Sequence, residues 1–189
     1  MVDPVGPLAS ARLKSVGVRR QLAKVRTRVA LASLTIGLPC ALSALSSPPM
    51  LLVWNASAST PRGLYRVFPG TRAQQGDWVV AQLPTAFRAL AARRRYLPLG
   101  VPLVKRVAAV GGDRICADGP AISINGQLAA ILQPWDGEGR ALPRWTGCRT
   151  LAPADLLLLG DSPWSFDGRY FGATKGADVI GRAVLLWRR

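Results

Sequence analysis

The stretch NASASTPRGLY, residues 55–65, places the hydroxyl side chains of Ser57, Ser59 and Thr60 directly before a proline and a glycine. A serine hydroxyl becomes a nucleophile when a neighbouring base takes its proton. Serine, threonine, proline and glycine are also ordinary turn residues, so the stretch equally fits a polar loop at the end of a hydrophobic segment. Which interpretation holds depends on the base that the rest of the chain can supply.

The chain contains no histidine. This excludes a Ser-His-Asp triad, Cys-His proteases and hydrolases whose zinc is bound by histidine. Carboxylates and lysine remain as possible bases, and Lys105 and Lys175 are the only lysines beyond residue 54. No GxxxxGK[ST] or GxGxxG motif is present, so nucleotide binding has no support. We therefore expect no cofactor and no metal ion.

Lys105 stands in the middle of the apolar stretch PLVKRVAAV. In an alternating strand it shares one face with Leu103 and Val107, while Val104 and Arg106 lie on the other face. A lysine among apolar neighbours loses hydration, and its pKa can fall far enough to leave it neutral near pH 7. It could then act as the base for a serine. The alternative is an edge-strand lysine whose ammonium reaches water.

The surrounding sequence predicts a mostly β fold. Residues 63–84 predict a strand, a turn and a second strand, and residues 85–97 predict a short amphipathic helix or a basic loop that contains three consecutive arginines. A strand around Lys105 is followed by a GGD turn and a hairpin with turns at DGP and NG. We interpret residues 129–150, rich in Gly, Pro and Trp, as a loop region. A strand of leucines before Gly160 and a last strand over 178–189 complete the domain.

The N-terminal third has the charge pattern of a membrane anchor. Lys and Arg number 25 against 10 Asp and Glu in the whole chain, and residues 1–28 alone carry seven positive side chains and one negative. An uncharged run over 29–54 follows, longer than the roughly 20 residues needed to span a bilayer. We expect a basic cytoplasmic segment (1–28), a membrane-anchoring helix (29–54) and an exported domain (55–189). Pro39 and the SSPP stretch shorten the span, so MLLVW at 50–54 lies at the interface or opens the domain; a cleaved signal is the alternative.

The cysteines agree with export. Cys40 lies in the apolar run, which leaves Cys116 and Cys148 as an even pair in the exported part. Disulfides persist outside the cytoplasm, so we expect these two to be bridged.

Three stretches in order resemble the motifs of the type I signal peptidase superfamily, the Ser-Lys membrane serine proteases of family S26. They are NASASTPRGLY, PLVKRVAAVGGD, and GDSPWSFDGRYFG followed by IGRA. The resemblance is strongest to the conjugal transfer branch and runs from about Asn55 to Ala183. It implies a signal-peptidase-like antiparallel β-sheet catalytic domain with one N-terminal anchoring helix.

The resemblance also assigns the two reacting residues. Ser59 would be the nucleophile and Lys105 the general base. Ser57 would supply an oxyanion-hole hydroxyl beside the backbone N–H of Ser59.

Supporting roles come from the third motif. Asp167 would support the site through Arg169 or Arg106, and Ser165 would orient the lysine. The chain departs from housekeeping signal peptidases, which carry S-M-x-P-T where this chain has STPRGLY, and it lacks a large second domain.

This departure favours a dedicated substrate. The resemblance implies a conjugative pilin precursor that is trimmed, and in relatives joined head to tail, for pilus assembly in plasmid transfer. The inner membrane, with the catalytic domain in the periplasm, and other proteins of the conjugation apparatus are the expected partners. A general signal peptidase and a non-catalytic component of the apparatus remain as alternatives. Nucleic acid is not expected, because no ladder of aromatic and basic residues accompanies Arg93–Arg95.

Overall fold

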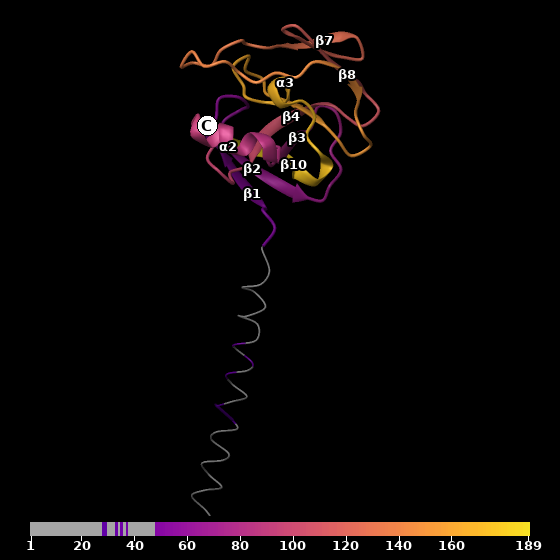
Figure 1. Cartoon of the computed structure of the whole chain (residues 1–189). Coiled ribbons are helices and arrows are strands. Elements are labelled where there is room, and N and C mark those ends of the chain that lie inside the picture. Colours follow the sequence, from indigo (N-terminus) through magenta and orange to yellow (C-terminus); the bar gives the residue numbers. More distant parts are fainter. Residues whose placement is uncertain (1–27, 30–32, 34, 36, 38–47) are drawn as a thin grey trace, which may run out of the picture. The chain divides into compact units, whose positions relative to one another are not determined.

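The computed structural model describes residues 28, 29, 33, 35, 37 and 48–189 (Figure 1). The expected basic segment and most of the expected anchor therefore lie outside the described residues. No helix in the described part is long and apolar enough to cross a bilayer. The chain divides into a unit up to Pro48 and a compact unit from Pro49 to Arg189, and the site lies in the second.

Antiparallel strands dominate the second unit, as expected from the sequence. The larger sheet has the order β1-β2-β10-β3-β4-β9 and the smaller one β7-β6-β5-β8. The first consists of β1 (Leu52–Asn55), β2 (Gly63–Pro69), β10 (Val179–Arg188), β3 (Trp78–Ala81), β4 (Leu103–Ala109) and β9 (Leu157–Leu159). The second consists of β7 (Gln127–Ile131), β6 (Ala121–Ile124), β5 (Arg114–Asp118) and β8 (Gly147–Thr150). The helices are α2 (Thr85–Arg93), α3 (Gly168–Phe171) and the 3₁₀ turn η1 (Gly176–Asp178).

The MLLVW stretch opens the domain, which was one of the two alternatives for it. Its last three residues begin β1, which pairs with β2 from Leu52 opposite Arg66 to Asn55 opposite Gly63. This pairing fixes the start of the serine-rich loop at one edge of the large sheet.

The strand that carries Lys105 is β4, and it is an inner strand. It pairs with β3 on one side and with β9 on the other. Alternation places Lys105 with Leu103 and Val107 on the face that packs toward α2 and α3. The side chain is 4% exposed, so the alternative of an edge-strand lysine in water is wrong.

The expectation of a loop over residues 129–150 is wrong at both ends. Residues 127–131 form β7 and residues 147–150 form β8, and only the segment between them is irregular. These two strands bury almost nothing, since every residue of β8 is exposed. Pairing to β6 and β5 and the covalent bond at Cys148 hold them, so the hydrophobic alternation that reveals a strand in the sequence is missing.

The expected turns and the expected disulfide are confirmed. Asn125 and Gly126 both have positive φ, as a tight hairpin turn requires, and they join β6 to β7. Cys116 and Cys148 lie directly opposite each other on β5 and β8 and form a disulfide. The bond ties the small sheet together next to the irregular segment.

Candidate active site

The serine-rich loop is organised by one side chain that the sequence analysis did not single out. Asn55 is buried at the end of β1. Its amide nitrogen lies 3.1–3.2 Å from the carbonyl oxygens of Ser57, Thr60 and Pro61 and 2.7 Å from Thr60 Oγ1, and its two N–H groups are shared among these acceptors. Its amide oxygen accepts the N–H of Ser57 at 3.1 Å. Asparagine at the start of a turn is a recognisable signal for such local bonding. The amide therefore fixes the loop that presents Ser59.

Lys105 contacts Ser59 of this loop. Lys105 Nζ donates to Ser59 Oγ at 2.5 Å, although the two residues are 46 positions apart in the chain. Burial lowers the pKa of Lys105 from 10.5 to about 8; Asp167 and Asp161 raise it and Arg169 lowers it, each by less than burial does. A lysine with this pKa is neutral in a substantial fraction of molecules at mildly alkaline pH. It can then take a proton from the serine hydroxyl.

Ser57 is exposed and lies beside Ser59. Their hydroxyl oxygens are 2.8 Å apart, and the backbone N–H of Ser59 donates to Ser57 Oγ at 3.1 Å. The two donors expected for an oxyanion hole are thus next to each other. In this structure one of them is bonded to the other, and rotation of the Ser57 side chain would free the N–H.

A buried ion pair holds the turn on the other side of the lysine. Asp167 is fully buried and binds Arg169 through Nε–Oδ1 at 2.9 Å and Nη2–Oδ2 at 3.0 Å. Arg169 also donates to the carbonyls of Gly160, Ser162 and Pro163, and Asp167 accepts the N–H of Gly160 at 2.7 Å. The pair therefore shapes residues 160–165.

That turn is connected directly to the serine-rich loop. The N–H of Asp161 donates to the carbonyl of Ser59 at 2.8 Å. A Cβ at Gly160 would lie 2.7 Å from the same carbonyl and 2.3 Å from Ser165 Oγ, so no larger residue fits there without movement. The position of Ser59 thus depends on Asp167 and Arg169 through one backbone hydrogen bond.

Arg106 is the expected supporting residue that the structure places elsewhere. Alternation along β4 turns its side chain to the face opposite Lys105, where it stacks over Trp78 at 3.9 Å and donates to the carbonyl of Gly76. It pairs with Asp161 at 3.6 Å and does not contact Asp167. Of the two arginines left open for Asp167, Arg169 is the partner.

Ser165 lies close to the lysine without a hydrogen bond to it. Its hydroxyl is buried and has no partner among the described residues. It lines the same pocket as Ser59 and Lys105. The expected contact that orients the lysine is therefore not formed in this arrangement.

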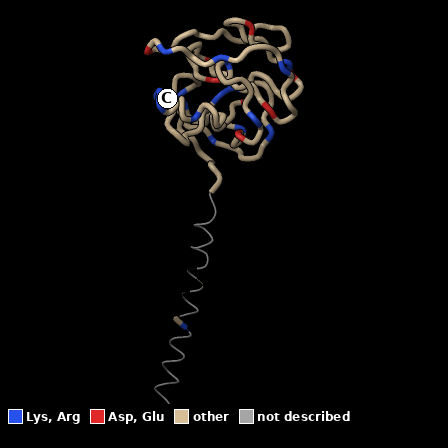
Figure 2. The backbone as a smooth tube through the Cα atoms, viewed as in Figure 1, with Lys and Arg blue, Asp and Glu red and all other residues tan. Residues whose placement is uncertain are grey.

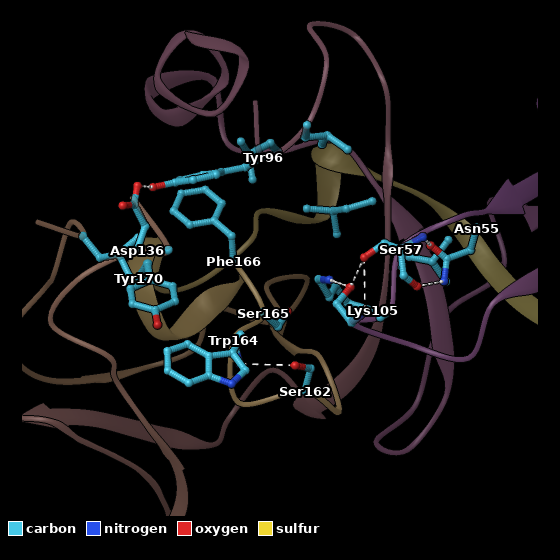
Figure 3. Close-up of a pocket in the computed structure, with 18 of the residues that line it drawn as sticks. Asn55, Ser57, Tyr96, Lys105, Asp136, Ser162, Trp164, Ser165, Phe166 and Tyr170 are labelled. Atoms are coloured by element: carbon cyan, nitrogen blue, oxygen red, sulfur yellow. Dashed lines mark hydrogen bonds between the residues drawn. The ribbon is translucent and has the colours of Figure 1, made fainter. Parts of the chain in front are cut away.

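The side chains of Ser59 and Lys105 line a pocket of about 510 Å³ (Figure 3). Ser57, Asn55 and Lys105 lie at one end and Tyr96 and Asp136 at the other, with Phe166 between them. The far wall comes from the irregular segment between β7 and β8, whose part in the site the sequence analysis missed. The pattern of that segment gives no sign that it folds back over the large sheet.

Comparison with known proteins finds one matching family model and several curated relatives. The signal peptidase family, peptidase S26, matches residues 24–188. The plasmid transfer protein TraF of Escherichia coli is 32% identical over 154 residues, which are 75% of this chain and 80% of the relative. The conjugal transfer protein TraF of Agrobacterium fabrum is 35% identical over 143 residues, 68% of this chain and 78% of the relative. A solved signal peptidase I from Enterococcus faecalis is 20% identical, covers 59% of this chain and 97% of its own with a TM-score of 0.34, and is too distant to bear on the site.

Proposed function

The chain belongs to the signal peptidase S26 family and, within it, to the branch of the plasmid transfer proteins TraF, and we propose that it is a serine endopeptidase with a Ser59–Lys105 dyad. The observation that carries the proposal is the 2.5 Å bond between Lys105 Nζ and Ser59 Oγ, with the lysine 4% exposed. A buried lysine that served only the fold would cost free energy that a methionine would not. This argues against a purely structural component of the apparatus.

In the proposed reaction neutral Lys105 removes the proton of Ser59 as Oγ attacks a peptide carbonyl. The oxyanion that forms is stabilised by the N–H of Ser59 and, after rotation, by the hydroxyl of Ser57. Lys105 then donates its proton to the leaving amine, and the acyl ester on Ser59 is released when Lys105 takes a proton from the attacking nucleophile. Ser165, whose buried hydroxyl has a free acceptor, would steady the lysine during these transfers.

We propose the precursor of a conjugative pilin as substrate and pilus assembly for plasmid transfer as the process. The support is the pair of TraF relatives, which are plasmid and conjugal transfer proteins by name. Cyclisation of the product would correspond to attack on the acyl ester by the substrate's own amine in place of water.

The proposed location is the inner membrane, with the domain in the periplasm. The basic residues 1–28 before an uncharged run support this orientation, and the disulfide fits an oxidising compartment. β1, at the end of that run, carries the exposed side chains of Leu52 and Trp54, and the Trp54 ring is 5.8 Å from that of Trp187. Tryptophans of this kind are common at membrane surfaces.

Basic and acidic residues are interspersed over the domain (Figure 2), which does not favour a nucleic-acid groove.

The experiment is incubation of the purified full-length protein with candidate pilin precursors, followed by mass spectrometry of the products. Ser59→Ala and Lys105→Met should each abolish cleavage. Lys105→Met should remain folded, because it removes the cost of a buried ammonium group. Lys175→Ala, at the exposed lysine of the domain, is the matched control and should cleave normally.

Wild-type turnover by Lys105→Met would rule out the dyad. Cleavage of many unrelated precursors would favour the general signal peptidase. A product lighter by one water than the linear cleaved chain would identify cyclisation, because attack by the substrate's own amine takes the place of hydrolysis.

A further inference from the structure

The pocket is larger than the reaction at Ser59 requires. At about 510 Å³ it lies within the ~300–1,000 Å³ range of sites for drug-sized ligands. Its far end, at Tyr96 and Asp136, lies across the same pocket from Ser57 and Lys105, with Phe166 between the two ends (Figure 3). There is room for several residues of a polypeptide in addition to the peptide bond that reacts.

Aromatic rings line the far end. The rings of Tyr96 and Phe166 are 4.8 Å apart, and those of Phe166 and Tyr170 lie nearly parallel at 5.7 Å. Trp135 and Trp164 also line the pocket and are 56% and 71% exposed. Exposed indole rings beside a fixed stack of rings offer both edges and faces to another apolar or aromatic side chain.

Asp136 is the charged side chain at this end of the pocket, and its hydrogen bonds determine whether a basic substrate side chain could bind there. Oδ1 accepts the backbone N–H groups of Glu138 and Arg140 at 3.0 and 2.9 Å. Oδ2 accepts from the Tyr96 hydroxyl and from Arg140 Nε, the latter at 2.7 Å. A carboxylate has about four lone-pair positions, and all are filled here. Asp136 therefore pins the irregular segment to Tyr96 and has no position left for a basic substrate side chain.

We propose that this far chamber, defined by Tyr96, Trp135, Leu142, Trp164, Phe166 and Tyr170, binds an aromatic or large aliphatic side chain of the substrate polypeptide. The inference rests on the proposed function, since the occupant is a segment of the polypeptide whose peptide bond lies at Ser59. The chamber is continuous with the dyad, its walls are aromatic and its carboxylate is saturated. It selects by apolar contact and not by charge.

The test measures binding without cleavage. Full-length Ser59→Ala protein in detergent is titrated against fluorescein-labelled peptides of Ala, Ser and Gly, in which one guest residue, Phe, Leu, Ala or Arg, is moved through every position. At one position Phe or Leu should bind about tenfold or more tighter than Ala, since a buried large apolar side chain is worth at least that factor. Arg at that position should bind no tighter than Ala.

Two variants locate the preference in the chamber. Phe166→Leu removes a ring of the stack, and Leu142→Trp fills the space; each should reduce the preference for Phe over Ala to about onefold. Phe68→Ala removes a half-buried ring of β2 outside the pocket and should leave the preference unchanged. Thermal melting establishes which variants are folded, and one folded variant of the two suffices.

The proposal is overturned if no peptide binds, if no position prefers Phe or Leu, or if the folded chamber variants keep the full preference. It is also overturned if Arg binds more tightly and Asp136→Asn removes that gain, because Asp136 would then be the receptor. Wild-type cleavage of the pilin precursors is scored separately. If the protein prefers Phe or Leu guests but cleaves no precursor, the proposed peptidase activity is refuted and the binding site remains. If it cleaves a precursor but shows no guest preference, only the proposed binding chamber is refuted.

Discussion

Burial lowers the pKa of Lys105, and three charged neighbours adjust it by less. Asp167 and Asp161 raise the pKa, and Arg169 lowers it. Asp167 and Arg169 carry opposite charges and form an ion pair, so their effects on the pKa of Lys105 oppose each other. Desolvation therefore determines that this pKa is lowered. The ion pair can thus shape the turn beside the lysine without holding it permanently charged.

The pH profile of cleavage should show this pKa. The proposed reaction needs neutral Lys105, so kcat/KM should rise with pH and reach half its plateau near pH 8, and it should be lost as the pH falls below that value. Initial rates on a peptide substrate between pH 6 and 10 measure the profile, and Lys175→Ala should give the same curve. A midpoint close to 10.5, the ordinary value for lysine, would mean that burial does not activate this residue.

Asp167→Asn should affect stability and the pH profile together. It leaves the Arg169 guanidinium, 4% exposed, without its carboxylate, and breaking a buried pair in this way costs about 3–5 kcal/mol. It also removes the carboxylate charge that most raises the pKa of Lys105, so the acidic limb should move to lower pH. Thermal melting and the pH profile check the two effects. The exposed Asp118→Asn is the control, and an unchanged melting temperature would contradict the structural role of the pair.

At the scale of elements, strands were predicted best where buried and exposed residues alternate along the chain. β2, β3, β4, β9 and β10 all contain buried apolar residues, and each was expected close to its observed bounds. The same alternation placed Lys105 on the inner face. β7 and β8 were not predicted, because strand pairing and a disulfide hold them in place and their side chains are largely exposed.

The site was predictable only through its motifs. No local pattern brings Ser59 and Lys105 together across 46 positions; the pairing of β3 with β4 and the Asn55-centred loop do so. The roles of Asp136 and Tyr96 depend on contacts between residues 40 apart, which neither periodicity nor composition reveals. Resemblance supplied the dyad, and it could not supply the far wall of the pocket.

Removing the disulfide should loosen that wall. Cys116 and Cys148 are 32 positions apart, and the segment that carries Trp135 and Asp136 lies between them. The chain-entropy estimate gives about 2–4 kcal/mol for such a bridge, so Cys116→Ser with Cys148→Ser should lower the melting temperature. Cleavage of a peptide with a large apolar guest should fall more than cleavage of its alanine counterpart. Equal stability with and without reductant would show that strand pairing alone holds β8.

At the scale of the whole molecule, the compact unit that carries the candidate site begins near the end of the uncharged run. That unit begins at Pro49, and β1 begins three residues later. A cut near Ser46, the alternative of a cleaved signal, would therefore leave every strand intact. Activity in solution cannot distinguish an anchored enzyme from a released one, because the site and its support all lie after residue 49.

Topology and retention of the N-terminus must be measured directly. A reporter that is active only outside the cytoplasm, fused after Arg189, should be active, because in the proposed topology the seven positive side chains of residues 1–28 keep that segment in the cytoplasm. The mass of the mature protein extracted from membranes should include the basic segment. Replacing the arginines and lysines of residues 12–28 by glutamine should reduce reporter activity, whereas the same replacement at Arg93, Arg94 and Arg95 should not. A mature N-terminus near Ser46 would show instead that the hydrophobic run is a signal removed after export. Any membrane binding of the mature protein would then come from the domain that follows.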